Sequence, residues 1–367
     1  MRYLLSVILV IVHLGLYAQN VNKQNFPEKK NFNRVEMALP VVNGYTVLRC
    51  DFHTHTVFSD GLVWPEYRVR EAWKQGLDVL AITDHIEYRP FKEYVGGDLN
   101  TSYELALPVA QELGIMLIRG TEVTRKQGVI GHFNALFIKD ANAIDQADPE
   151  KALQAAYDQG AFIMYNHPGW AVDTCLLTEF QQAMIEKGLV RGIEVFNNDE
   201  FYPRALSWSR DQNLTVFSSS DIHWTINDVL ETHVLEGVET HFRPVTLLFV
   251  EENTQEGVRE ALDNRRTLAY FYGNVAGEER WLKSLFLASV KLEKISEKGK
   301  SAFYKMTNFS GIQYTFTIGN AQYMLDGGSS IHITLPVNQR EVSLHVLNMH
   351  YYEGKHPLVS MVLTKNN

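Results

Sequence analysis

DFHTHTVFSDG, residues 51–61, places two histidines and an aspartate close together where a β-strand runs into a turn. His53 and His55 flank a single residue, so on a strand both side chains project to the same face. Two imidazoles with this spacing are able to chelate one metal ion. Asp60 and Gly61 follow at the turn and bring a carboxylate nearby. Core histidines often produce the same pattern, so the interpretation depends on what the rest of the chain supplies.

From Thr46 the chain alternates short apolar segments with helix-like segments, several of which end in glycine. Near-continuous apolar strands with intervening helices indicate a parallel sheet, and about seven such units favour its closure into a barrel. The predicted strands cover 46–53, 77–85, 115–123, 132–138, 161–167, 192–198, 214–221 and 245–252, and the predicted helices cover 65–76, 101–114, 149–160, 177–188 and 201–213.

Polar residues recur at the carboxyl ends of these predicted strands. Barrel enzymes build their active sites at that rim, so this distribution favours a barrel over an open sheet. Crowded imidazoles and carboxylates repel one another or stay unsatisfied unless a cation organises them. We therefore interpret the set jointly as metal ligands, although each histidine alone would more often be structural. The nine residues are His53, His55, Asp60, His85, Glu122, His132, His167, Asp221 and His223.

With these motifs in this order, residues 49–228 resemble the PHP (polymerase and histidinol phosphatase) phosphoesterases. The resemblance implies an α/β fold, a distorted seven-stranded β/α barrel, and two or three divalent metal ions. It implies that His53, His55, Glu122 and Asp221 hold one ion. It implies that Asp60, His85 and His223 hold a second, and that Glu122, His132 and His167 hold a third. A narrower resemblance is to an exported phosphodiesterase branch, known from bacteria that degrade organophosphate esters, which has a C-terminal β domain.

The expected chemistry is hydrolysis of phosphate esters at these ions. Imidazole and carboxylate ligands without thiolate suit Zn²⁺, Mn²⁺ or Fe²⁺ equally. Two such ions are able to share a bridging hydroxide and clamp the phosphoryl oxygens during in-line attack. Asp60, Asp84 and Arg125 are the candidate catalytic residues. Asp84 would orient a ligand or a water, or simply cap a strand, and Arg125 with Lys126 would bind a phosphate oxygen, or be solvated loop charges.

The residues around the motifs favour phosphodiesters over monoesters. Few cationic donors lie near them (Arg89, Arg125 and Lys126), whereas Tyr88, Trp170, Phe196 and Trp224 are available as walls for organic groups. Three alternatives stay open: a phosphomonoesterase of the same fold, a metal-dependent C–N hydrolase, and an inactive metal- or glycan-binding surface protein. A C–N hydrolase usually has a bridging lysine carboxylate, and no lysine ends a motif-bearing strand here.

Four segments are expected along the chain. Residues 1–18 have the shape of a signal peptide, which predicts an exported protein in the periplasm or outside the cell. Residues 19–45 are an extended lead-in and residues 46–280 form the barrel. Residues 281–367 are predicted to form a small all-β sandwich from strands at 303–310, 314–320, 330–336, 341–349 and 358–364. The four histidines in that segment are not expected to bind metal.

The expected partner is a small-molecule phosphate ester. The formal net charge of −9 argues against binding of a nucleic-acid duplex, which requires a basic surface. No stable membrane insertion is expected after signal cleavage, because no other segment is apolar enough to span a bilayer. The sequence leaves the oligomeric state open.

Overall fold

The computed structural model describes residues 34–125, 127–170, 175–226 and 243–363, and every structural statement below concerns these residues. The predicted signal peptide, most of the lead-in and Lys126 lie outside them. No helix in these ranges combines the length and the apolar character that crossing a membrane requires.

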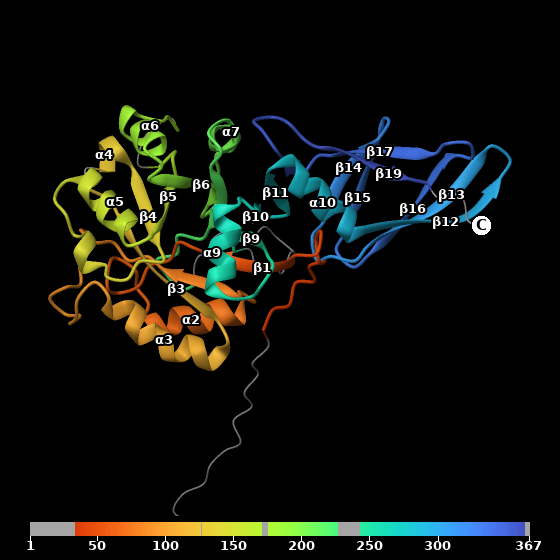
Figure 1. The fold of residues 1–367 in the computed structure, drawn as a ribbon. Helices are drawn as coiled ribbons and strands as arrows, with labels where there is room; N and C mark the ends of the chain where they lie inside the picture. Colours follow the sequence, from red (N-terminus) through yellow and green to blue (C-terminus); the bar gives the residue numbers. More distant parts are fainter. Residues whose placement is uncertain (1–33, 126, 171–174, 227–242, 364–367) are drawn as a thin grey trace, which may run out of the picture. The chain divides into compact units, whose positions relative to one another are not determined.

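One curled sheet of twelve strands forms the barrel part (Figure 1). Its order is β18-β11-β10-β9-β1-β2-β3-β4-β5-β6-β7, with β8 also paired to β6. The strands are β1 Thr46–Asp51, β2 Val79–Ile82, β3 Met116–Val123, β4 His132–Leu136, β5 Phe162–Asn166, β6 Val190–Asn197, β7 Glu200–Phe201, β8 Thr215–Ser219, β9 Val245–Val250, β10 Thr267–Phe271, β11 Asn274–Gly277 and β18 Met349–His350. The predicted α/β class and distorted barrel are confirmed.

The prediction of a parallel sheet is wrong for part of this barrel. The pairs β1–β2, β2–β3, β5–β6 and β6–β8 are parallel, whereas β3–β4, β4–β5, β1–β9 and β9–β10 are antiparallel. Only residues 124–131, which include the short helix α4 (Gln127–Ile130), separate β3 from β4. A parallel crossover needs a dozen residues or more, so this connection permits only an antiparallel partner.

The curled sheet turns back on itself at β8, which contacts β9, the neighbour of β1 in the sheet. The Ser218 amide donates to Thr246 Oγ1 of β9, and Thr246 Oγ1 donates to the Ser218 carbonyl, both at 3.0 Å. Just beyond β8, Ile222 forms a parallel bridge with Thr54, which follows β1. These contacts bring the carboxyl ends of β1 and β8 together at the rim. The interior below is apolar, with the ring of Phe217 meeting Phe52 and Phe162 at centroid distances of 5.5 and 5.7 Å.

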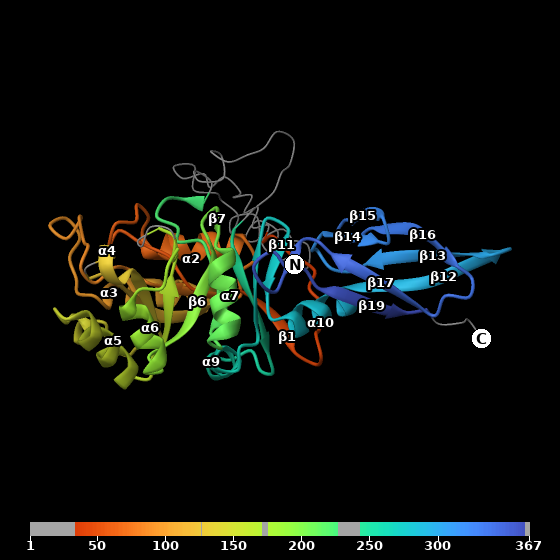
Figure 2. The ribbon, with the colours of Figure 1, turned by 90° about the horizontal axis from the view of Figure 1, so that it is seen from above.

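All five predicted helices are present, and local signals explain their ends. Proline occupies the first turn of α2, α5 and α7, where its missing N–H costs nothing. Gly114 ends α3 in the left-handed conformation at φ 71°. Figures 1 and 2 show α2 and α3 side by side. The barrel helices are α2 Pro65–Lys74, α3 Thr101–Leu113, α5 Pro149–Asp158, α6 Glu179–Glu186, α7 Pro203–Asp211 and α9 Gln255–Asp263.

The C-terminal part is the predicted all-β sandwich. Its sheets have the orders β12-β13-β16 and β15-β14-β17-β19, and every pair in them is antiparallel. The prediction missed β12 and β15, whose residues are largely exposed and so give little apolar periodicity. The strands are β12 Val290–Lys298, β13 Ser301–Asn308, β14 Tyr314–Ile318, β15 Ala321–Leu325, β16 Ser330–Pro336, β17 Glu341–Val346 and β19 Leu358–Val362.

Helix α10 (Glu279–Ser289) connects the two parts, and the boundary predicted at 280/281 falls inside it. Its buried side chains Trp281, Leu285 and Phe286 belong to an apolar cluster that contains residues of the barrel and of the sandwich. In addition, β18 of the C-terminal segment pairs with β11 of the barrel sheet. The two parts therefore share a continuous core.

Candidate metal centre

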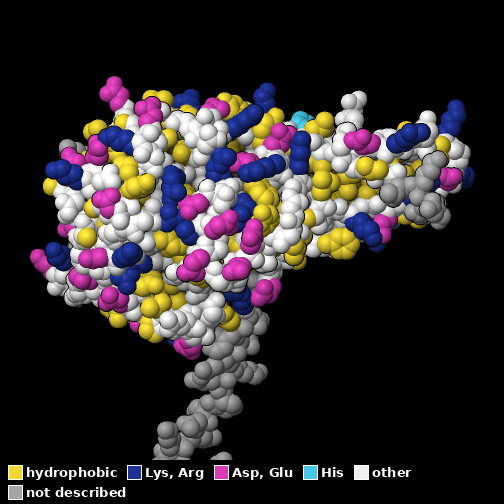
Figure 3. Space-filling model, in the orientation of Figure 1, with side chains coloured by type: hydrophobic (Ala, Val, Ile, Leu, Met, Phe, Trp, Pro, Cys, Tyr) yellow, Lys and Arg dark blue, Asp and Glu magenta, His cyan; other side chains and the backbone are white. Residues whose placement is uncertain are grey.

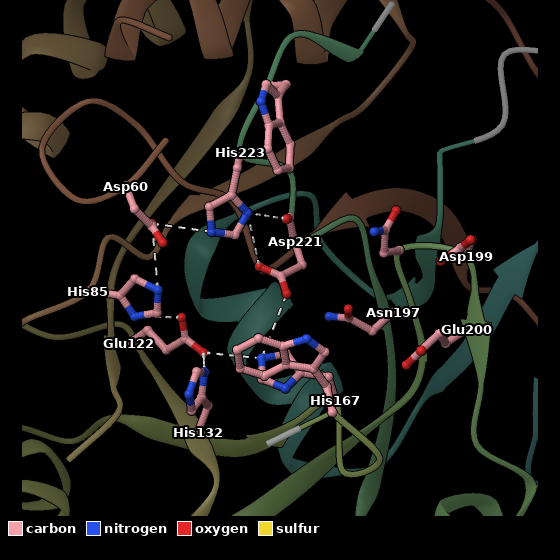
Figure 4. A pocket seen from close by; sticks show the side chains of 13 residues that line it. Asp60, His85, Glu122, His132, His167, Asn197, Asp199, Glu200, Asp221 and His223 are labelled. Atoms are coloured by element: carbon pink, nitrogen blue, oxygen red, sulfur yellow. Dashed lines mark hydrogen bonds and ion pairs between the residues drawn. The ribbon is translucent and has the colours of Figure 1, made fainter. Parts of the chain in front are cut away.

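A cavity of about 380 Å³ opens at the rim of the barrel, and the predicted ligands gather around it (Figure 4). Seven of the nine line the cavity directly, and His53 and His55 lie buried immediately beneath them. The contributing segments span more than 160 residues of sequence but meet because their strands end at the same rim. The lining residues are Asp60, His85, Glu122, His132, His167, Trp170, Asn197, Asn198, Asp199, Glu200, Asp221, His223 and Trp224.

The first predicted ligand group surrounds one point. His53 Nε2 and His55 Nε2 are 3.1 Å apart. Each lies 3.3 Å from Glu122 Oε2, and Asp221 Oδ1 lies 3.2 Å from the first nitrogen and 3.1 Å from the second. Four donors at about 2.0 Å from a tetrahedral ion would be about 3.3 Å from one another. The two imidazole nitrogens thus lie at this distance from each other and from one oxygen of each carboxylate, so these residue types fit a divalent cation.

The second group centres on the carboxylate of Asp60. Its Oδ1 lies 3.2 Å from His223 Nε2 and 3.6 Å from His85 Nε2. Together with His55, these donors fall within 4.8 Å of one another. Asp60 Oδ1 is buried and makes no hydrogen bond, as expected of an atom that would bind a cation.

Glu122 joins the first group to the third. Its Oε2 faces His53 and His55, while its Oε1 lies 3.0 Å from His132 Nδ1 and 3.5 Å from His167 Nε2. Glu122 is fully buried and presents one oxygen to the histidines of the first predicted group and the other to those of the third. His167 and Asp221 adopt positive φ angles of 23° and 50°, which are uncommon for non-glycine residues.

The pKa values of His55 and His85 in this cluster shift in opposite directions. Burial opposes protonation of His55, but its hydrogen bonds to the carboxylates of Asp221 and Glu122 outweigh burial and raise its pKa to about 9. Burial dominates at His85, where it lowers the pKa to about 4 and leaves a neutral imidazole at pH 7. Burial would raise the pKa of Asp60, but His223, His55 and His85 lower it to about 2. In the absence of a cation, a proton on His55 thus offsets part of the negative charge of Asp221 and Glu122.

Asp84, which was predicted to orient a ligand or a water or to cap a strand, is not among the residues that line the cavity. Its Oδ1 accepts from the Thr56 amide at 2.7 Å and from Ser59 Oγ at 2.8 Å, and its Oδ2 accepts from Thr56 Oγ1 at 2.7 Å. Ser59 Oγ in turn lies 3.2 Å from His55 Nδ1. Asp84 therefore reaches His55 through Ser59, and this relay would keep Nε2 free of its proton for a cation.

Arg125 is not among the described residues that line the cavity, and its role in binding a phosphate oxygen stays a prediction. Its guanidinium pairs with Asp145 and lies 3.4 Å from Glu87. Of the predicted walls, Trp170 and Trp224 line the cavity, whereas Phe196 is buried in an apolar cluster and Tyr88 is exposed.

Glu194 is a buried carboxylate beside the site that the sequence did not single out. It is fully buried on β6, where its Oε1 accepts from His53 Nδ1 at 3.0 Å. Its Oε2 accepts from the His167 amide and from Asn197 Nδ2, both at 2.8 Å. A carboxylate behind a metal-ligating histidine fixes the ring and its tautomer. The available signal was a glutamate inside the otherwise apolar segment GIEVF.

Arg68 was also missed, and it joins the two main ligand segments. It is fully buried on α2 and donates to the carbonyls of His55 (3.0 Å), Ile222 (3.1 Å) and Trp224 (2.9 Å). Glu71, one turn further along, accepts from Arg68 at 2.5 Å and from the Ile226 amide. Helix α2 thereby positions the segment after β1 against the segment after β8.

The matches with known proteins agree with this geometry. Residues 51–187 match the PHP domain family model. A crystal structure from Bacteroides vulgatus, of a two-domain protein containing a predicted PHP-like metal-dependent phosphoesterase, is 36% identical. It superimposes with a TM-score of 0.83 over 90% of this chain and 99% of that one.

Two curated relatives match over shorter segments. An uncharacterized protein of Methanocaldococcus jannaschii is 48% identical over 13% of this chain. A 5'-3' exoribonuclease of Haemophilus influenzae is 35% identical over 20% of it. These matches span only 22% and 23% of the two relatives.

A mixed β/α barrel with histidines and carboxylates clustered at its rim is typical of metal-dependent hydrolases. The chain belongs to the PHP family of metal-dependent phosphoesterases. The assignment of each ligand to a particular ion stays a prediction.

Proposed function

We propose that this protein hydrolyses small organic phosphodiesters with two or three divalent cations, Zn²⁺, Mn²⁺ or Fe²⁺. The observation that carries the proposal is the convergence of nine imidazole and carboxylate side chains at one rim, where His53 and His55 lie 3.1–3.3 Å from each other and from the carboxylates of Glu122 and Asp221. Bound cations would polarise a phosphoryl oxygen and activate water for in-line attack.

The chain's own residues would prepare this reaction. Glu122 and Asp221 supply the negative charge that retains the cations, and Glu194 and Ser59 hold the rings of His53 and His55. Because these groups are buried and already oriented, little reorganisation accompanies the reaction. Trp170 and Trp224 provide apolar surface for the organic part of the ester.

The charges of the cavity support a diester. Among the described residues that line it there is no lysine or arginine. A dianionic monoester would therefore depend on the cations alone, whereas a diester carries one charge less and needs room for a second organic group. The absence of a lining lysine likewise gives no support to a C–N hydrolase with a lysine-derived bridge.

The size of the cavity supports a small substrate. A volume of about 380 Å³ is near the lower end of the range of small-molecule sites, about 300–1,000 Å³. Figure 3 shows acidic and basic side chains interspersed over the face in view, without the continuous basic stripe that a nucleic-acid duplex would need. We therefore propose a free small-molecule ester as the partner.

A substrate panel tests the proposed function. Bis-aryl phosphate, aryl phosphate, an aryl phosphonate ester and an aryl amide would be assayed with Mn²⁺ and with Zn²⁺. We expect the highest kcat/KM for bis-aryl phosphate.

His55→Ala and Asp221→Ala should lose metal and activity together, because ligands of one site act as a unit. A tenfold preference for aryl phosphate, about 1.4 kcal/mol of transition-state binding, would favour the monoesterase. Metal binding without any turnover would favour the inactive binding protein.

We further propose that the protein is exported. The support is in the sequence: Arg2, the apolar run from Leu4 to Leu16 and the small residue Ala18 form a signal-peptide pattern. Cell fractionation and N-terminal sequencing of the native protein would test it. Recovery of the full-length chain in the cytoplasm would contradict export.

A further inference from the structure

Two buried asparagines adjoin the predicted metal ligands but have no part in the proposed reaction. Asn134 of β4 and Asn166 of β5 are both fully buried. Side chains alternate along a strand, so Asn134 projects to the same face of β4 as His132. The strand register places Asn134 opposite Glu122 and Asn166 opposite His132. The two carboxamides therefore lie next to the carboxylate that joins the first and third ligand groups.

Hydrogen bonds fix which end of the Asn166 carboxamide faces Glu122. Asn166 Oδ1 accepts from the Asn134 backbone amide at 3.2 Å, and a backbone amide is only a donor. The NH₂ group therefore lies at the other end, where Nδ2 donates to Glu122 Oε1 and to Asn134 Oδ1, both at 2.9 Å. Asn134 is held in turn, because its Nδ2 donates to the Phe52 carbonyl at 3.1 Å. The donor that meets Glu122 is thus part of a fixed network.

The two oxygens of Glu122 have different surroundings as a result. Oε1 accepts from Asn166 and faces the histidines of the third group, whereas Oε2 lies 3.1 Å from His85 Nδ1 and faces the histidines of the first group (Figure 4). Among the described residues, no amide or hydroxyl group donates to Oε2.

This difference affects how well each oxygen would bind a cation. A carboxylate oxygen has about two lone pairs, so Asn166 occupies one of the two on Glu122 Oε1. An amide does not give up its proton, whereas a cation displaces the proton of an imidazole that becomes its ligand. Both lone pairs of Oε2 are therefore available to cations, but only one lone pair of Oε1 is.

We propose that Asn166 is a positioning residue that makes the metal centre fill in a fixed order. Its amide holds Glu122 with Oε2 directed at the first and second ligand groups and leaves Oε1 one lone pair for the third. The third group also has one predicted protein ligand fewer than the first. The third ion therefore binds more weakly than the other two and enters last. This inference rests on the metal-binding part of the proposed function and does not depend on which ester is cut.

Binding of the metal alone tests this order. Metal-free full-length protein would be dialysed against Mn²⁺ at rising free concentration, and the bound ions would be counted at each step. The wild-type protein should bind two ions first and the third at a free Mn²⁺ concentration about tenfold or more higher.

Asn166→Ala should narrow this gap between the second and third ions. The first two ions should bind about tenfold more weakly, because Glu122 loses the partner that orients it. The affinity for the third ion should change by less than about threefold, because the freed lone pair of Oε1 offsets the loss of orientation. A general loss of stability would instead weaken all three ions alike and leave the gap as it was.

Two further asparagine variants make the test specific. Asn134→Ala removes one acceptor of the Asn166 amide but keeps the backbone amide that orients it, so the gap should narrow by about threefold. This milder variant decides the question if Asn166→Ala does not fold. Asn308→Ala in the sandwich is the matched control, because Asn308 is also fully buried and its Nδ2 donates to the Ile312 carbonyl. It should destabilise the protein but keep the wild-type gap.

The outcomes separate this inference from the proposed function. Three ions of equal affinity in the wild-type protein would overturn the ordering role of Asn166 and leave the phosphoesterase standing. A gap that is unchanged in Asn166→Ala and Asn134→Ala, or a third ion in neither the wild-type protein nor the variants, would overturn it as well. Wild-type protein that binds neither Mn²⁺ nor Zn²⁺ would overturn the proposed function and with it the inference.

Discussion

His55 shows at the scale of one residue how the site is arranged. Its Nε2 faces Glu122 and Asp221, while its Nδ1 contacts Ser59. The two nitrogens of one ring thus have separate partners, and only Nε2 is directed at the first ligand group. In the metal-free protein this ring binds a proton where the cation would bind.

The pH dependence of the metal-free protein should reflect that proton. The pKa of His55 is about 9 when folded against an ordinary 6.5, so its contribution to stability is complete below pH 6.5 and is lost as pH rises through 9. Asp60, with a lowered pKa of about 2, contributes above its ordinary 3.8, and its contribution is lost as pH falls through 2. His85, whose pKa is lowered from 6.5 to about 4, loses its contribution as pH falls from 6.5 to 4. We therefore expect the free energy of unfolding to be greatest near pH 6.5, and to fall between pH 6.5 and 9 by up to about 1.4 kcal/mol per pH unit for one proton.

Chelator-treated protein unfolded with urea at several pH values would measure this. Saturating Zn²⁺ or Mn²⁺ should weaken the alkaline decline, because the cation supplies the positive charge that the proton supplied. Stability of the metal-free protein that rises from pH 6.5 to 9 would contradict this account of His55.

Glu194→Gln tests whether the buried carboxylate behind His53 matters for metal binding. The amide keeps the size of the side chain but places an NH₂ group against a donor at His53 or at the His167 amide. We expect metal affinity to fall about 10- to 100-fold, as for other groups that orient metal ligands. A chelator-competition titration would measure it, with Glu256→Gln as the exposed control. Affinity within twofold of wild type would rule out the orienting role.

At the scale of secondary-structure elements, α2 is the part that joins the two ligand segments. Arg68→Met should cost about 3–5 kcal/mol, because it leaves buried Glu71 without its charged partner and removes one donor from each of three carbonyls. It should also weaken metal binding, since the segments after β1 and β8 lose their common support. Arg68→Lys should recover little, because lysine lacks the planar fork.

Arg70→Met on the same helix is the matched control. The Arg70 side chain is 50% exposed and its nearest carboxylate, Glu112, lies 3.8 Å away. An exposed pair of this kind contributes little, so a change of no more than about 0.5 kcal/mol is expected. Urea unfolding of the metal-free variants compares the two positions. Similar losses for Arg68→Met and Arg70→Met would contradict the role given to Arg68.

The elements also show what the sequence was able to predict. Proline at helix starts and glycine after helix ends are local signals, and the predicted helices were correct. The antiparallel pairing of β4 was missed because pairing direction is set by connection geometry, which strand periodicity does not report. Arg68 and Glu194 look like ordinary helix and strand residues in sequence, and the pairing of Arg125 with Asp145 is tertiary. Motif residues were found because their chemistry is unusual at strand ends.

At the scale of the whole molecule, the sandwich contributes to the core under the barrel. Phe286 of α10 packs on Tyr314 and Phe316 of β14, at centroid distances of 4.9 and 6.3 Å. Near the cavity, His350 of β18 contacts Phe201 of β7, the strand that carries Glu200, at 5.2 Å. The C-terminal part therefore supports the barrel at two places although it supplies none of the nine predicted ligands.

Removing residues 290–367 tests this shared core. The deletion leaves all nine ligands in the chain, but it exposes the apolar face of α10 and removes β18 from its pairing with β11. Burying each large apolar side chain is worth about 1.5–3 kcal/mol, and an exposed patch of several promotes aggregation. We expect the truncated chain to be largely insoluble, and its soluble fraction to unfold at a lower temperature than the full chain.

Solubility, thermal unfolding and metal content of both chains would be compared. A soluble truncation with unchanged unfolding temperature would show that the barrel does not depend on the sandwich. A folded truncation without metal would show that the ligands are not confined to the barrel.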